Sequence, residues 1–324
     1  DFYQYATGGW QKNNPLPAAY SRFGSFDLLQ DNVNKQVNII LTDLAKKKYK
    51  DGTTERKLSD FYKLAMDVDS RNASGITSVK PLLNEIESTE TKDALQQLQL
   101  KYGKQGYGFP FASYFGADDK NVTMNIYSLQ QGGLTLGQRD WYLNNDKATS
   151  DIRVAYKKHI ARMFGLFGFT EAQAQQKAAD IFRFETMLAL VSKSNTELRD
   201  PQANNKMTLK EFEENNPNIP LKAIAQAEGI DSKYIQELVV GQPAFFAGYD
   251  KIFETLSADE LKSIVEWDVI MNASSYLSDE VREANFDFFG RTMKGRKEDY
   301  PLWKRATNQV EGAMGEALGK MYCE

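Results

Sequence analysis

The chain has 324 residues, with 40 Lys and Arg against 44 Asp and Glu, so its formal net charge is −4. This length corresponds to about two domains, the acidic balance argues against a nucleic-acid partner, and no apolar run approaches the ~20 residues of a membrane span. The single cysteine, Cys323, and the single histidine, His159, exclude an internal disulfide and any zinc site with two histidine ligands.

Apolar residues recur every three or four positions along much of the chain. Stripes of this kind predict helices over about 27–48, 58–65, 79–86 and 152–167. Gly168 follows the last of these stripes and is expected to end that helix.

Further helix starts are marked by capping-box spacing at Thr170, Thr208 and Ser257, each with Gln or Glu three residues later. A last stripe, over 310–321, has no glycine cap or following proline before Glu324. It is either an ordinary terminal helix or part of a longer protein that continues beyond this sequence.

Strand signals are confined to one region. The stretch 107–114 is rich in aromatic residues, and apolar and polar residues alternate over 122–127, with a turn-like 116–121 between them. We therefore expect a β-hairpin at about 107–130 in a mainly α-helical protein. The segments 195–205 and 215–220, rich in Asn, Asp and Pro, are the expected linkers.

Candidate chemical groups are few. Asp67 and Asp69 begin like a calcium loop, but the glycine and the closing glutamate are missing, so a polar helix end is expected. The pair Asp118-Asp119 is expected to be a solvated turn. His159 is expected to be a structural histidine and Cys323 a small buried apolar residue.

Arg22 is the most informative charge near the N-terminus, because it lies among Tyr20, Phe23 and Phe26. A guanidinium held by aromatic neighbours offers two parallel donors to a carboxylate. The alternatives are an internal ion pair or stacking on the rings.

Several longer stretches carry a resemblance to a known family. In chain order they are Phe2-Tyr3-x-Tyr5, Gly8-Gly9-Trp10, Ser21-Arg22-Phe23-Gly24, Phe115 to Asn121, Gln131 to Leu134, Arg139 to Leu143, Arg199-Asp200-Pro201, Asn205 to Thr208, Trp303-Lys304-Arg305 and Val310 to Glu324. The chain resembles the N-terminal part of the neprilysin and endothelin-converting-enzyme family of zinc metallopeptidases, especially its bacterial members.

This resemblance implies the multi-helix N-terminal cap lobe of such a peptidase, over about 1–250, followed by connecting helices over 251–324 that lead towards a catalytic lobe. The zinc motif His-Glu-x-x-His would lie beyond residue 324, so no catalytic or metal-binding residue is expected in this chain, and the fragment alone is expected to be inactive. The full enzyme would use zinc to cleave small peptides in a closed cavity. The catalytic lobe of the same polypeptide would be the partner of this chain.

The resemblance also places Arg22 at a position where the family binds the free carboxylate of a substrate. A second arginine of neprilysin corresponds to Gln30, so we expect a weaker demand for a free C-terminus. Export to the periplasm or cell surface is implied in the same way. The alternative function is a stand-alone helical module that binds peptides or a protein without catalysis.

Overall fold

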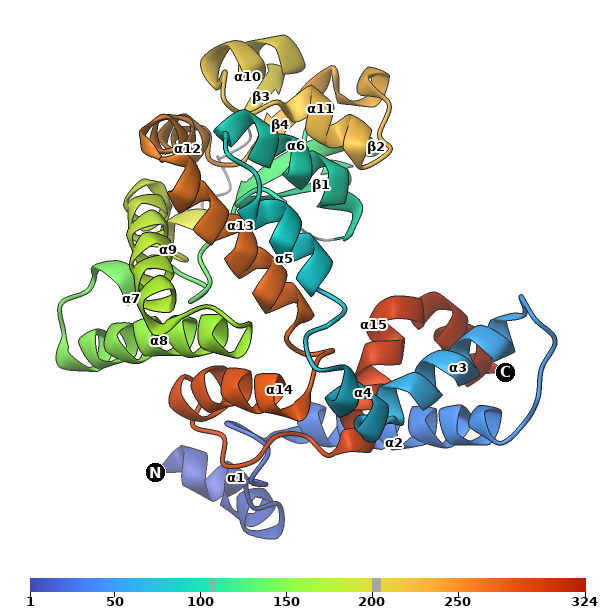
Figure 1. Ribbon diagram of the computed structural model, residues 1–324. Helices are drawn as coiled ribbons and strands as arrows, with labels where there is room; N and C mark the ends of the chain where they lie inside the picture. Colours follow the sequence, from blue (N-terminus) through green and yellow to red (C-terminus); the bar gives the residue numbers. More distant parts are fainter. Residues whose placement is uncertain (106–107, 200–204) are drawn as a thin grey trace. The chain divides into compact units, whose positions relative to one another are not determined.

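The computed structural model describes residues 1–105, 108–199 and 205–324. The chain forms two compact units, which are described separately (Figure 1): unit 1 consists of Asp1–Gly75 and Tyr276–Glu324, and unit 2 is Ile76–Ser275. Both units are mainly helical, which confirms the expected fold class. The boundary near residue 250, between a cap lobe and helices that connect it to a further lobe, stays a prediction.

Unit 1 contains six α-helices and one π-helical turn within its described residues. They are α1 (Phe2–Asn13), α2 (Ser25–Ala45), α3 (Thr54–Met66), α4 (Val68–Ser74), α14 (Asp279–Phe286), η4 (Asp287–Thr292) and α15 (Leu302–Cys323). The side chain of Asp67 accepts a hydrogen bond from the Ser70 N–H at the start of α4. This confirms that the calcium-loop-like pattern is a helix cap, which satisfies a free backbone donor.

The core of unit 1 forms where α15 packs against α2 and α3 (Figure 1). Val310 and Leu318 of α15 are buried with Leu41 of α2 and Leu58 of α3. The stripe expected over 310–321 is therefore confirmed, although α15 has non-helical backbone angles at Met314. Cys323 is exposed rather than buried, so that prediction was wrong. It is the last residue of α15 and does not belong to the buried cluster that Val310 and Leu318 form.

Unit 2 contains the remaining helices and all the strands that the described residues form. They are α5 (Lys80–Glu87), α6 (Lys92–Tyr102), η1 (Gly103–Gln105), β1 (Phe111–Asp118), β2 (Asn121–Gln131), α7 (Asp140–Leu143), α8 (Lys147–Leu166), α9 (Glu171–Val191), η2 (Glu197–Arg199), β3 (Lys206–Thr208), α10 (Leu209–Asn215), α11 (Leu221–Ala227), η3 (Ser232–Ile235), β4 (Glu237–Val240), α12 (Pro243–Thr255) and α13 (Ala258–Ala273).

The expected helix boundaries of unit 2 are confirmed at several points. Capping boxes form at Thr170, Thr208 and Ser257, where α9, α10 and α13 begin. Gly168 follows α8 with φ +95°, a backbone conformation that side-chain-bearing residues rarely adopt. Local sequence therefore determines where these helices begin and where α8 ends.

The expected hairpin is confirmed as β1 and β2, which pair antiparallel from Phe111↔Gln131 to Asp118↔Asn121. It belongs to a larger sheet with the strand order β1-β2-β4-β3. Strand β4 pairs parallel to β2, with Tyr127 opposite Leu238, and β3 pairs antiparallel to β4. Tyr107, at the start of the predicted hairpin, lies outside the described residues. The sheet therefore has two more strands than the sequence patterns indicated.

Both expected linkers connect elements within unit 2. The segment 215–220 joins α10 to α11, whereas residues 200–204 of the first linker lie outside the described ranges. Asp118 was expected to be solvated but is 5% exposed, because its carboxylate forms an ion pair with Lys206 of β3. In the parts of the chain that the structure describes, no helix has the length and apolarity to cross a membrane.

Candidate functional site

Arg22, the predicted substrate-binding residue, lies in the segment that connects α1 to α2 in unit 1. Tyr20 and Phe23 contact each other edge to face, with ring centroids 5.1 Å apart, and Phe23 stacks on Trp10 at 6.2 Å. These ring contacts hold the backbone on both sides of Arg22. Of the aromatic neighbours named from the sequence, Tyr20 and Phe23 therefore fix the segment, whereas Phe26 is exposed.

The Arg22 side chain itself is exposed. Within the described residues it forms no ion pair and no cation–π contact. Neither an internal ion pair nor ring stacking thus accounts for this guanidinium. Its donors remain available for a carboxylate from outside unit 1.

A partly buried ion pair between α15 and α2 contacts the same segment through Tyr20. Lys304 of α15 is 7% exposed at its side chain and forms an ion pair with Asp31 of α2, and both groups are hydrogen-bonded to the Tyr20 hydroxyl. The Lys304 ammonium also lies over the rings of Tyr300 and Tyr20, at 4.2 and 4.8 Å from the centroids. This cluster joins the segment that carries Arg22 to both α2 and α15.

The charges of this cluster are well defined. Burial alone would raise the pKa of Asp31, but hydrogen bonds from Lys304 and Tyr20 outweigh it and hold that pKa below its usual value. Burial and the neighbouring Asp31 carboxylate raise the pKa of Tyr20. At neutral pH Asp31 is therefore ionised and the Tyr20 phenol is neutral.

A cavity of about 270 Å³ opens beside this cluster, and polar side chains line it. They are Tyr20, Asp27, Gln30, Asn34, Tyr300, Lys304 and Asn308. Gln30 donates a hydrogen bond to Asn34 at 2.9 Å, and the Asp27 carboxylate accepts one from the Gly24 N–H at 2.8 Å. Gln30 thus contributes a neutral amide to the lining of this cavity.

Sequence reasoning missed Lys304 as part of this site, although it lies in the stretch Trp303-Lys304-Arg305 that supports the family resemblance. The surface of this segment presents the exposed guanidinium of Arg22, and Tyr20 of the same segment lines the recess of hydrogen-bonding groups. Such a surface can bind and orient an anionic end of a ligand.

The zinc that the resemblance implies has no ligand set in the described residues, because no three His, Cys, Asp or Glu side chains converge there. His159 is 5% exposed and contacts Trp267 edge to face, at 5.9 Å between centroids, as expected of a structural histidine. The described residues of this chain therefore do not fit a zinc centre.

Comparison with known proteins agrees with this architecture. The sequence model of peptidase family M13 matches residues 1–324, and the chain therefore belongs to this family. Human neprilysin is 26% identical over 357 residues, which cover 100% of this chain and 46% of the relative. Human endothelin-converting enzyme 1 is 26% identical and covers 99% of this chain and 43% of the relative. The chain thus spans about half the length of these curated relatives.

Solved structures give the same result. The zinc metalloprotease Zmp1 of Mycobacterium tuberculosis, in complex with an inhibitor, superposes with a TM-score of 0.93 at 25% identity. The superposition covers 99% of this chain and 49% of Zmp1. PepO of Lactobacillus rhamnosis has a TM-score of 0.81 at 19% identity, over 99% of this chain and 50% of that protein, and supports the fold alone.

Proposed function

We propose that this chain is the non-catalytic N-terminal part of a zinc-dependent metalloendopeptidase that cleaves small peptides. The observation that carries the proposal is the match of the M13 family model to residues 1–324, in a chain that covers 49% of a zinc metalloprotease structure. In this proposal the chain walls one side of the substrate cavity, while the zinc and the reacting groups belong to residues beyond 324.

Exposed apolar side chains on unit 1 support the proposal that another lobe packs against it. Helix α1 has no buried residue, and Phe2 and Tyr5 on it are 81% and 87% exposed. Phe26 of α2 is 85% exposed. Large apolar side chains of this kind are typical of surfaces that another protein segment covers. We propose that the catalytic lobe of the same polypeptide covers them, and that residues 251–324 lead towards that lobe.

We propose that Arg22 binds the C-terminal carboxylate of the peptide and so positions the scissile bond. The exposed, unpaired guanidinium on a segment fixed by rings supports this role, since a guanidinium without an internal partner can form two parallel hydrogen bonds to a carboxylate. With Gln30 in place of a second cation, the enzyme would tolerate peptides without a free C-terminus.

The coding sequence that follows the codon for Glu324 provides the first test. An open frame that contains His-Glu-x-x-His supports the proposal. A stop codon close to Glu324 would contradict it and would favour the stand-alone binding module.

The activity test uses the polypeptide that this frame encodes and a short peptide with a fluorophore and a quencher at its ends. We expect cleavage that 1,10-phenanthroline abolishes and added zinc restores, and no cleavage by residues 1–324 alone. Cleavage by residues 1–324 alone would contradict the non-catalytic assignment. We also propose export to the periplasm or cell surface, which fractionation of the native cells tests directly.

A further inference from the structure

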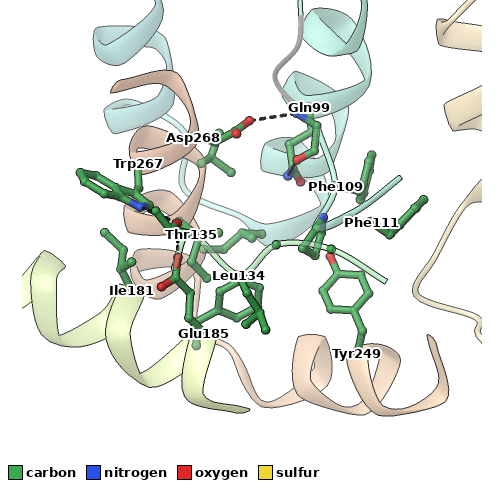
Figure 2. A pocket seen from close by; sticks show the side chains of 18 of the residues that line it. Gln99, Phe109, Phe111, Leu134, Thr135, Ile181, Glu185, Tyr249, Trp267 and Asp268 are labelled. Atoms are coloured by element: carbon green, nitrogen blue, oxygen red, sulfur yellow. Dashed lines mark hydrogen bonds between the residues drawn. The ribbon is translucent and has the colours of Figure 1, made fainter. Parts of the chain in front are cut away.

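Unit 2 contains a partly open cavity of about 370 Å³ that the proposed function does not use. Its walls come from α6, α9, α12, α13, the entry to β1 and the loop after β2 (Figure 2). A second recess of about 240 Å³ shares Gln99, Gly108, Phe109, Phe111 and Asp268 with it. Together these volumes are in the range of small-molecule sites, about 300–1,000 Å³.

Aromatic rings and hydrogen-bond acceptors line the cavity. Phe109, Phe111, Tyr249 and Trp267 contribute rings, and Phe111 lies 5.8 Å from Phe109 and 6.5 Å from Tyr249 between ring centroids. The charged residues among the described lining of both recesses are Glu185, Glu228 and Asp268, without any Lys or Arg. The interior is therefore suited to a cation with an apolar body.

Gln99 contributes an unsatisfied acceptor. It is 5% exposed, and its Nε2 donates to the Gly108 carbonyl oxygen at 2.9 Å. Its Oε1 is buried and has no hydrogen-bond partner among the described residues. A buried acceptor without a donor is costly, by about 1–3 kcal/mol, so a ligand that supplies an N–H would be favoured here.

Asp268 contributes a partly buried carboxylate that has no cationic partner among the described side chains. One oxygen accepts a hydrogen bond from the Gly108 N–H and the other from Asn272 Nδ2, both at 3.0 Å. No ion pair with Asp268 forms within the ranges that the structure describes. Burial raises the pKa of this carboxyl to about 6, so the group is still mostly ionised at pH 7.

Gln99 and Asp268 are both hydrogen-bonded to Gly108, so the free Oε1 of Gln99 and the Asp268 carboxylate lie close to the same residue. In Figure 2 they lie together at one end of the pocket, with Tyr249 at the other end. Glu185 is already satisfied, because it accepts hydrogen bonds from the hydroxyls of Thr135 and Tyr142. The unsatisfied Gln99 oxygen and the uncompensated Asp268 charge thus both lie next to Gly108.

We propose that this cavity binds a small organic ammonium ion with an apolar or aromatic body. The ammonium contacts the Asp268 carboxylate and Gln99 Oε1, and the body lies among Phe109, Phe111 and Trp267. The proposal is independent of peptidase activity, because every group it uses belongs to unit 2 and the readout is binding.

Titration calorimetry with phenethylammonium chloride at pH 7.5 tests the proposal, with 3-phenylpropan-1-ol as the uncharged probe. We expect phenethylammonium to bind at least ten-fold more tightly than the alcohol. Asp268→Asn should weaken binding of phenethylammonium at least ten-fold and leave binding of the alcohol unchanged. Asp259→Asn, which removes the same charge from an exposed position of α13, should change neither.

Equal affinity for the two probes, or no binding of phenethylammonium up to about 10 mM, would overturn the proposal. Unchanged binding of phenethylammonium by a folded Asp268→Asn protein would overturn it as well. The comparison of the two probes on the unsubstituted protein decides the question even if that variant does not fold.

Discussion

The ammonium nitrogen of Lys177 on α9 lies 2.6 Å from a carboxylate oxygen of Glu266 on α13, and the Glu266 side chain is fully buried. Lys177 also contacts Glu87 at 2.8 Å. Burial raises the pKa of Glu266 to about 8. The position of this carboxyl between α5, α9 and α13 therefore depends on Lys177 as its one cationic partner in the described residues.

Lys177→Met should lower the free energy of unfolding by about 2 kcal/mol, because it removes the hydrogen-bond donor of a buried Glu266 carboxyl that is mostly protonated at pH 7. Glu266→Gln should cost less, since Lys177 keeps its contact with Glu87. Urea denaturation followed by circular dichroism measures both. Lys147→Met removes an exposed ion pair and should change stability by less than about 0.5 kcal/mol. A Glu266→Gln loss larger than that of Lys177→Met would contradict this reasoning.

Glu185 should make stability depend on pH. Burial raises its pKa from 4.5 to about 7, although hydrogen bonds from Thr135, Tyr142 and Tyr156 oppose the shift. The folded state then binds the proton more tightly than the unfolded state does. Glu185 therefore contributes about 3 kcal/mol to the free energy of unfolding below about pH 4.5, and this contribution is lost as the pH rises through 7.

Glu185→Gln should remove this part of the pH dependence, because glutamine cannot ionise. The measurement is the free energy of unfolding at half-unit steps between pH 4 and pH 8, with the unsubstituted protein as reference. Identical slopes for the two proteins would show that Glu185 does not titrate in this window.

Gly168 should be sensitive to substitution although it lies in open space. Its φ of +95° strains any other residue, so Gly168→Ala should cost about 1–2 kcal/mol. Gly165, three residues earlier and inside α8, is the matched control. Gly165→Ala should stabilise the protein by up to about 1 kcal/mol, because alanine favours helix. Thermal denaturation of the two variants should therefore shift in opposite directions, and equal shifts would contradict the argument.

The proposed role of Arg22 predicts a substrate-dependent effect in the full-length enzyme. Arg22→Gln should lower kcat/KM about ten-fold for a peptide with a free C-terminus, because one charge-assisted contact is lost, and much less for the same peptide amidated. The control is Lys35→Gln, which removes an exposed charge from α2. Amidation alone should weaken cleavage by the unsubstituted enzyme without abolishing it. Abolished cleavage would contradict the reasoning from Gln30.

The sequence predicted the helical class, the capped helix starts and the hairpin because each depends on residues close together in the chain. Strands β3 and β4 have three and four residues, too few for a recognisable alternation. Their pairing joins Tyr127 to Leu238, a relationship that local patterns do not contain.

The candidate site was predictable to a similar extent. Arg22 and its aromatic neighbours are local, and the resemblance placed Gln30 beside them. The ion pair between Lys304 and Asp31 joins residues 273 positions apart, so neither residue marks the other in the sequence. The free acceptor of Gln99 depends in the same way on the position of Gly108, which only the folded chain fixes.

The discontinuous course of unit 1 has a consequence for how the protein is made. Leu41 and Leu58 pack against Val310 and Leu318, which the ribosome adds after the whole of unit 2. During synthesis unit 2 can fold as a continuous insertion. The apolar face of α2 and α3 stays exposed until α15 has been synthesised. The step most exposed to chaperone capture or aggregation is therefore the docking of α15, the last helix of the described chain.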